Sequence, residues 1–199
     1  MSRYLPLLIT ACLSLSACST VSKTLDRINF LKSDEPATDI DDEAAMTFSQ
    51  FGRFSGEWKC TAQQRGDSGW VQQPGVHTWR WYPILDGTAM QDEWLSDPEA
   101  PGPRTLGTNV RIWNTERDRW EIAWTSNRQQ EWDLIWAEQV RGDMVMHMSR
   151  PKRAAYNAHV ARITFHNITE NSFDWRYESA PLTDARNYTE QSRLRCLRD

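Results

Sequence analysis

The chain has 199 residues with a formal net charge of −4, and 11 of its residues are tryptophan. This length accommodates one ordinary domain with a short extension. The acidic balance and the lack of a basic cluster exclude the electrostatic footprint of nucleic-acid binders, and no apolar stretch after residue 17 is long enough to span a bilayer as a helix.

The first residues predict a secretory signal peptide at 1–17. Arg3 supplies a positive charge, and residues 5–15 form an apolar run that is followed by two small residues. Such a segment is typical of an export signal and is too short to cross a bilayer comfortably. The tetrapeptide Leu-Ser-Ala-Cys that ends at Cys18 resembles the lipobox of bacterial lipoproteins. The alternative is an ordinary secreted protein in which this cysteine occurs by chance.

The lipobox resemblance implies that Cys18 becomes the first mature residue, with a diacylglycerol on its sulfur and a third acyl chain on its amine. Two or more acyl chains anchor a protein firmly to a bilayer. Ser19 stands where an aspartate would favour the inner membrane, so the resemblance implies an anchor in the outer membrane and a domain in the periplasm. The polar residues 18–38 are predicted to form a flexible tether, and residues 39–199 the folded domain.

A short helix is predicted after the tether. Acidic residues crowd positions 39–43, and the N-terminus of a helix favours negative charge. Ala44, Phe48 and Phe51 would share one helical face. We expect that face to pack on one end of the domain.

From residue 54 onward the sequence alternates with a period of two, so that each run has one apolar and one more polar face. The alternating runs are 54–60, 77–82, 90–95, 120–125, 131–136, 144–149, 161–166 and 173–178. Half-buried antiparallel strands have this pattern, and turn signals such as Asp86-Gly87 and Arg141-Gly142 separate the runs. The sequence therefore predicts an all-β fold, an antiparallel up-and-down β-barrel without exposed edges. A two-sheet sandwich is the main alternative.

The start of the first run resembles a known family. Residues 56–58 (Gly-Glu-Trp) follow a short helix and resemble the G-x-W motif of lipocalins and their calycin relatives. In that family the tryptophan closes one end of the barrel and packs against an arginine of the last strand. The resemblance implies that Trp58 has this role, with Arg193 or Arg195 above it in a cation–π contact.

Further segments resemble bacterial lipocalin-like families of uncharacterised function. They are the turn at 85–87, the hairpin at 112–122 and the late segment at 168–177, and the likeness spans roughly residues 50–198. The turn motifs differ from those of typical secreted lipocalins. The ligands of those lipocalins therefore cannot be carried over to this chain.

The cysteines predict one disulfide. Cys12 leaves with the signal peptide and Cys18 is the lipid site, which leaves Cys60 and Cys196. Alternation places both sulfurs on the apolar faces of the first and last strands, and these strands are neighbours if the barrel closes. The periplasm permits disulfides. Two buried free thiols are the alternative.

The apolar strand faces suggest a binding cavity. Closed barrels of this size can enclose a small ligand, and aromatic side chains would line it. The predicted lining residues are Trp79, Trp81, Trp94, Trp124, Trp136, Met146 and Phe165. The same side chains could instead fill the core. The partners expected are thus the bilayer, through Cys18, and a small apolar or aromatic molecule; the alternative is a structural envelope lipoprotein with a filled barrel.

No catalytic residue, metal ligand or cofactor is assigned. Met144, Met146 and Met148 are soft ligands that would suit Cu(I), but alternation places His147 on the opposite face. The histidines do not fit a zinc spacing, although one could ligate haem. Asp92 shares the face of Trp94, and a buried structural carboxylate is preferred there to an acid catalyst.

Overall fold

One antiparallel sheet dominates the described part of the chain, residues 49–129, 131–154 and 157–199, in this computed structural model. The strands are β1 (Gly56–Gly66), β2 (Gly69–Gln72), β3 (His77–Ile84), β4 (Ala89–Leu95), β5 (Leu106–Asn114), β6 (Arg119–Ser126), β7 (Asp133–Val140), β8 (Asp143–Met148), β9 (Lys152–Ala154), β10 (Asn157–His166), β11 (Ser172–Pro181) and β12 (Thr189–Arg198), and a 3-10 turn, η1 (Leu182–Asp184), precedes β12. Within these ranges no helix is long and apolar enough to cross a bilayer.

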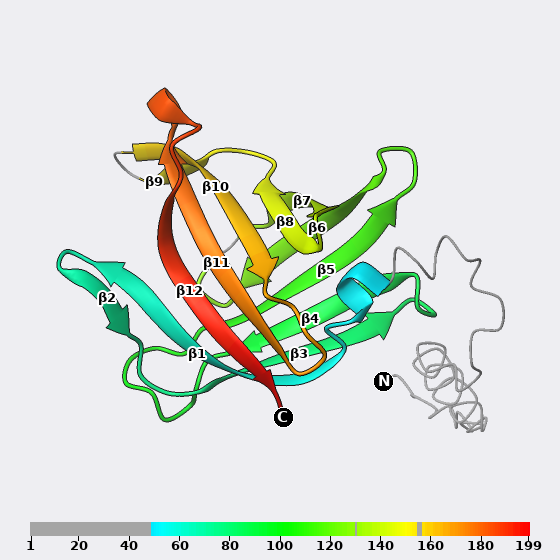
Figure 1. The fold of residues 1–199 in the computed structure, drawn as a ribbon, viewed down its shortest axis with the longest axis horizontal. Coiled ribbons are helices and arrows are strands. Elements are labelled where there is room, and N and C mark those ends of the chain that lie inside the picture. The colour runs from blue at the N-terminus through cyan, green and yellow to red at the C-terminus, as the bar shows by residue number, and fades with distance from the viewer. Residues whose placement is uncertain (1–48, 130, 155–156) are drawn as a thin grey trace, which may run out of the picture. The chain divides into compact units, whose positions relative to one another are not determined.

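The sheet closes on itself into a ten-stranded barrel (Figure 1). Its strands follow chain order from β1 through β3–β8 to β10–β12, and β12 pairs with β1 to close the ring. The short strands β2 and β9 lie beside the ring, paired with β1 and β10. This arrangement confirms the predicted antiparallel up-and-down barrel and excludes the sandwich.

Tight turns join neighbouring strands where the sequence predicts them. Arg141 and Gly142 both have positive φ, 53° and 95°, between β7 and β8. A two-residue hairpin of type I′ needs this conformation, because its twist matches that of the strands. Asp86 and Gly87, between β3 and β4, also have positive φ.

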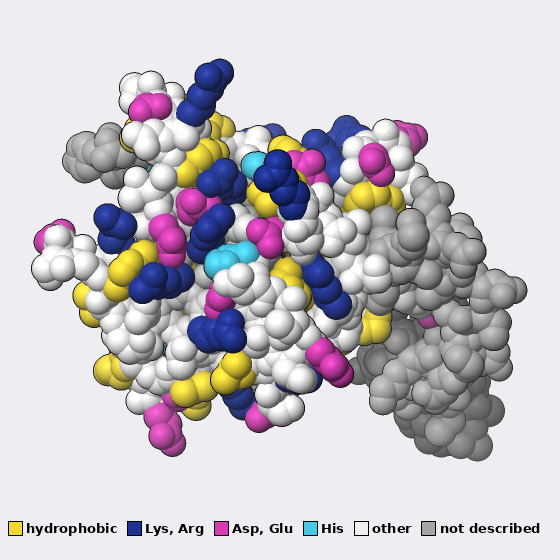
Figure 2. Space-filling view, in the orientation of Figure 1, with side chains coloured by type: hydrophobic (Ala, Val, Ile, Leu, Met, Phe, Trp, Pro, Cys, Tyr) yellow, Lys and Arg dark blue, Asp and Glu magenta, His cyan; other side chains and the backbone are white. Residues whose placement is uncertain are grey.

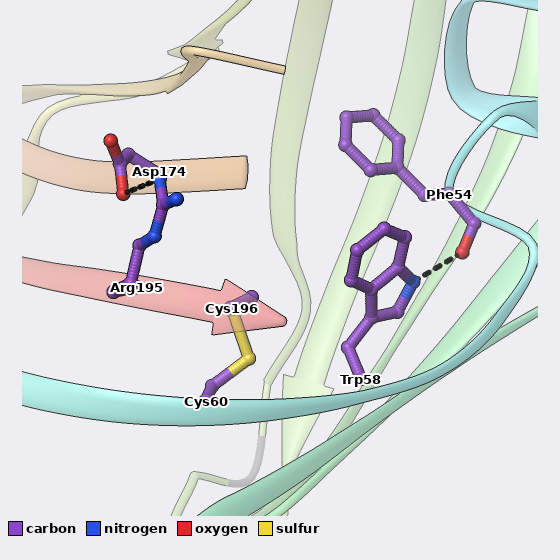
Figure 3. The surroundings of a disulfide bond; sticks show 6 residues. All are labelled: Phe54, Trp58, Cys60, Asp174, Arg195 and Cys196. Carbon is purple, nitrogen blue, oxygen red and sulfur yellow. Dashed lines mark hydrogen bonds and ion pairs between the residues drawn. A yellow bond between two sulfur atoms is a disulfide. The ribbon is translucent and has the colours of Figure 1, made fainter. Parts of the chain in front are cut away.

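A disulfide locks the seam of the barrel. Cys60 in β1 and Cys196 in β12 face each other directly in the strand register and are bonded (Figure 3). Both are fully buried. The predicted bridge is confirmed, and it ties the first strand to the last across a separation of 136 residues.

An aromatic core fills the barrel end where β1 begins. A helical segment at 49–52 places Phe51 against the ring of Trp120, with 5.2 Å between centroids, and Phe54 lies 5.1 Å from Trp81. The buried aromatic residues of this core are Phe51, Phe54, Trp58, Trp81, Trp120, Phe165 and Phe173. The remainder of the predicted helix, 39–48, lies outside the described residues.

Trp58 contributes to this closed end, but its arginine partner is not the predicted one. The indole Nε1 donates to the Phe54 carbonyl at 2.6 Å (Figure 3), and Arg198 lies over the ring at 4.2 Å. Arg193 instead lies over Trp70, and Arg195 is ion-paired with an acid on the outer face. The reason is that side chains alternate along β12. Arg198 lies on the same face as the buried Cys196, whereas Arg193 and Arg195 lie on the opposite face.

The outer face of β10–β12 is covered with charged side chains of both signs (Figure 2). Arg162 donates twice to Glu178, at 2.9 and 3.0 Å, and Arg195 pairs with Asp174 at 2.9 Å. The more exposed of the two, Arg195–Asp174, is of a kind that contributes little stability, whereas Glu178 is buried beneath its arginine partner. Both pairs make this face polar, in contrast to the barrel interior.

Strand β7 reverses the predicted orientation. Ile135 and Ala137 point inward and are buried, whereas Trp136 lies on the outside, stacked on His147 with 4.2 Å between rings. Trp132, just before the strand, is 56% exposed. The prediction failed because Leu134 and the largest apolar side chain of β7, Trp136, lie on its outward face. Ile135 and the small Ala137 lie on its inward face.

Candidate ligand cavity

The barrel encloses a cavity of about 500 Å³ at the end away from the Phe51 core. Much of its wall comes from the start of β3 and β7 and from the ends of β4, β6 and β8. The core residues lie farther from this end, with Trp81 past the middle of β3 and Trp120 near the start of β6. The volume falls within the range of ordinary small-molecule sites. The barrel is therefore filled at one end and hollow at the other.

Aromatic side chains form much of the apolar part of the cavity wall. Four tryptophans line it, and we call them the cavity tryptophans: Trp79, Trp94, Trp124 and Trp175. Trp79 meets Trp94 edge to face at 5.3 Å, and Trp175 lies 6.5 Å from Trp79. Aliphatic side chains complete the apolar surface: Ala62, Ile135, Met146, Met148, Ile163 and Leu194. The arrangement suits a flat apolar body.

Most of the predicted lining residues lie on this wall. Those that do are Trp79, Trp94, Trp124, Met146 and Phe165. Trp81 is inward but lies in the filled core, and Trp136 is outside the barrel. Trp175 and Ile163 also line the cavity. Both are on strand faces that the sequence predicts to be inward, although they are not among the predicted lining residues.

Gly107 makes room for one cavity tryptophan. A Cβ at this position would lie 2.0 Å from Cη2 of Trp124, which occupies the cross-strand space over the glycine. Gly107 in β5 is opposite Ser126 in β6. The ring of Trp124 thus lies against β5 because position 107 has no side chain.

The floor of the cavity carries a buried charge pair. Arg111 in β5 lines the cavity, and its Nη1 forms an ion pair with Oδ2 of Asp92 in β4; both side chains are 0% exposed. Asn109 donates from Nδ2 to both Asp92 oxygens at 3.1 Å. Burial lowers the pKa of the Arg111 guanidinium and the Asp92 carboxylate opposes this shift, but an arginine stays protonated in proteins.

The guanidinium of Arg111 is stacked between aromatic rings. Its Cζ lies 4.2 Å from the centroid of Trp81 and 4.9 Å from that of Phe51. A desolvated cation–π contact of this kind stabilises a buried cation. The aromatic rings thus cover the two faces of the guanidinium. At its edge, however, Nε and Nη2 have no hydrogen-bond partner among the described residues.

Sequence reasoning missed Asn109 and Arg111. In β5, Val110 and Ile112 made the opposite face the more apolar one, although Ile112 is 49% exposed. One signal was available. Asp92 was expected to face inward, and in a meander the next strand must supply the partner of a buried acid. Asn109 is directly opposite Asp92 in the register.

Two loops meet at the cavity mouth through Asp97. Its Oδ2 accepts from the Val76 amide at 2.9 Å, and its own amide donates to Nδ1 of His77 at 3.1 Å. His77 is buried against Trp94 at 5.1 Å. Burial lowers the pKa of His77, partly offset by the Asp97 charge. The imidazole is therefore neutral near pH 7, with Nδ1 as acceptor.

The methionine run does not form a metal site with its histidine. Met144 and Met146 are buried inside the barrel, while His147 stacks on Trp136 outside. Among the described residues, no group of three or more His, Cys, Asp or Glu side chains could hold a metal ion.

Comparison with known proteins shows the fold alone. No family model matches the sequence, and no curated protein matches it. A solved structure titled as the S-type phycobiliprotein lyase CPES from Guillardia theta, a calycin-like barrel, is similar with a TM-score of 0.50 at 10% identity. The match covers 81% of this chain and 98% of that one. The lipocalin-like fold is thus supported by an independent structure.

Proposed function

We propose that this protein is a lipid-anchored periplasmic barrel that binds a small apolar or aromatic molecule without transforming it. The observation that carries the proposal is the 500 Å³ cavity with its four cavity tryptophans. Burial of apolar surface drives such binding at about 25 cal/mol per Å². The likeness to a protein named as a lyase, at 10% identity, concerns the fold alone, so no lyase activity is carried over to this chain.

A non-catalytic role is supported by the state of the buried acid. Asp92 is the carboxylate at the floor, and both of its oxygens accept from Asn109 while it is ion-paired with Arg111. A general acid or base must lie within hydrogen-bond reach of the substrate, and Asp92 is not among the residues that line the cavity. Asp92 is instead engaged in holding the floor of the cavity together.

The anchor and the location rest on the sequence. Cys18 lies outside the described residues, and its lipidation is supported by the lipobox resemblance and the preceding apolar run. The Cys60–Cys196 disulfide is compatible with an oxidising compartment. Changing Cys18→Ser should release the protein from membranes into the soluble periplasm; a variant that still fractionates with membranes refutes the anchor.

Binding is tested by titrating the purified domain with a lipophilic fluorescent probe such as a pyrene derivative. We expect saturable quenching of tryptophan emission, because the probe would lie among the cavity tryptophans. Trp124→Ala should weaken binding at least tenfold. Trp132→Ala is the matched control, since this side chain is exposed on the outside, and it should leave affinity unchanged. Equal effects of the two substitutions would contradict the proposal.

A second candidate function, contact with an envelope partner, is favoured by one observation. The register of β5–β7 places Val110, Ala123 and Leu134 in one apolar row on the outside. In the next row Glu121 lies between Ile112 and Trp136. Ile112 and Leu134 are 49% and 50% exposed. A photo-crosslinker placed at Leu134 in living cells should then give a specific adduct that one at the charged position Arg193 does not. Adducts at both positions or at neither would contradict this role.

A further inference from the structure

The unpaired polar atoms at the cavity floor are all donors. Nε and Nη2 of Arg111 and Nε1 of Trp79 are buried and have no hydrogen-bond partner among the described residues. Both residues line the cavity. Buried donors are normally paired, because leaving one unpaired costs its full desolvation penalty. The floor therefore has a deficit of acceptors.

The donors belong to one small region. The Trp79 ring lies 5.2 Å from the Trp81 ring, which in turn lies under the Arg111 guanidinium at 4.2 Å. Trp81 Nε1 is also buried and unpaired. The adjacent carboxylate does not pair them: Asp92 accepts from Asn109 and is ion-paired with Nη1 of Arg111, and no hydrogen bond joins it to these donors.

We propose that the ligand carries a hydrogen-bond acceptor group, a carboxylate or a carbonyl, that enters first and binds Arg111 and Trp79 at the cavity floor. This inference rests on the proposed function and specifies its ligand class. The apolar body then lies among the cavity tryptophans, below the mouth at His77 and Asp97. An arginine edge is a strong partner for an oxygen acceptor, and more so for a charged one. The buried pair with Asp92 balances the charge, so a neutral carbonyl is also accommodated.

Three pyrene probes that differ in the end group of the chain test the contribution of the head group apart from that of the apolar body. They are 1-pyrenebutyric acid, its methyl ester and 1-butylpyrene, titrated against the full disulfide-bonded domain by tryptophan quenching. We expect the acid and the ester to bind at least tenfold more tightly than the hydrocarbon. Tighter binding of the acid assigns the head as a carboxylate, and equal binding of acid and ester assigns it as a carbonyl.

Matched variants locate the effect. Trp79→Phe keeps an aromatic ring and removes the N–H, so it should reduce the preference for an acceptor head several-fold. Trp124→Phe is the same change at a cavity tryptophan whose N–H is not among the buried unpaired donors. It should alter the affinity for all three probes alike, so that the ratio between the acceptor probes and the hydrocarbon stays as in the wild type. Arg111→Met should abolish the preference, and if this variant fails to fold, the Trp79→Phe comparison still decides.

The outcomes distinguish this inference from the proposed function. Equal affinity for all three probes overturns the acceptor head while ligand binding stands. An unchanged preference in Trp79→Phe likewise overturns it. If none of the three probes binds, both the proposed function and this inference fail.

Discussion

Breaking the buried pair at the cavity floor should cost the barrel much of its stability. Asp92 and Arg111 are both 0% exposed, so Asp92→Asn leaves a buried cation without its counter-charge. Removing one partner of a buried pair typically costs about 3–5 kcal/mol, a large share of the stability of an ordinary domain. Arg111→Met should cost a similar amount, because it leaves the Asp92 carboxylate with Asn109 as its partner.

The double variant measures the interaction energy between the two charges. Asp92→Asn combined with Arg111→Met removes both charges, and the summed single losses should exceed the double loss by about 2–3 kcal/mol. The measurement is equilibrium urea unfolding, followed by tryptophan fluorescence with the disulfide intact. Strictly additive losses, or an Asp92→Asn variant within about 0.5 kcal/mol of wild type, would refute this account of the floor.

Three further perturbations test other parts of the structure. Replacing Cys60 and Cys196 by alanine should lower the free energy of unfolding by about 4–5 kcal/mol, because the bridge spans 136 residues; an unchanged denaturation midpoint would contradict this. Gly107→Val should displace the Trp124 ring, since even a Cβ would lie 2.0 Å from it, and weaken probe binding at least tenfold in a folded protein; wild-type affinity would show that the ring does not shape the cavity. The pKa of His77 is lowered from 6.5 by burial, so its contribution to stability is present above about pH 6.5 and is lost as the pH falls below it. Denaturation at pH 5 to 7 should therefore show a smaller pH dependence in His77→Gln, and identical slopes would refute this role.

The alternation of the sequence predicted the barrel because most strands of this fold carry their large apolar side chains inward. The registers of β3, β6 and β8 follow the expected parity, and the bridge at Cys60 followed from the same reasoning. The rule failed at β7, where the outside of the barrel is apolar. Counting apolar residues cannot distinguish an inward face from an outward face that carries Trp136.

The candidate site was predictable in its apolar part and not in its polar part. Trp79 and Trp124 lie on runs with clear alternation, so their inward orientation follows from the sequence. The hollow end could not be predicted, since the volume left open depends on which side chains fill the other end. Arg111 was missed because a charged residue is expected outside unless its partner is known, and that partner, Asp92, lies on another strand.

The central claim is that a ligand lies among the cavity tryptophans, and indole N–H signals test it directly. The protein is labelled with ¹⁵N at tryptophan, its side-chain resonances are assigned by substitution, and 1-pyrenebutyric acid is added. The account predicts that the signals of the cavity tryptophans shift in a saturable manner while those of Trp132 and Trp136 stay in place. Shifts confined to Trp132 and Trp136, or no shifts at all, would contradict it.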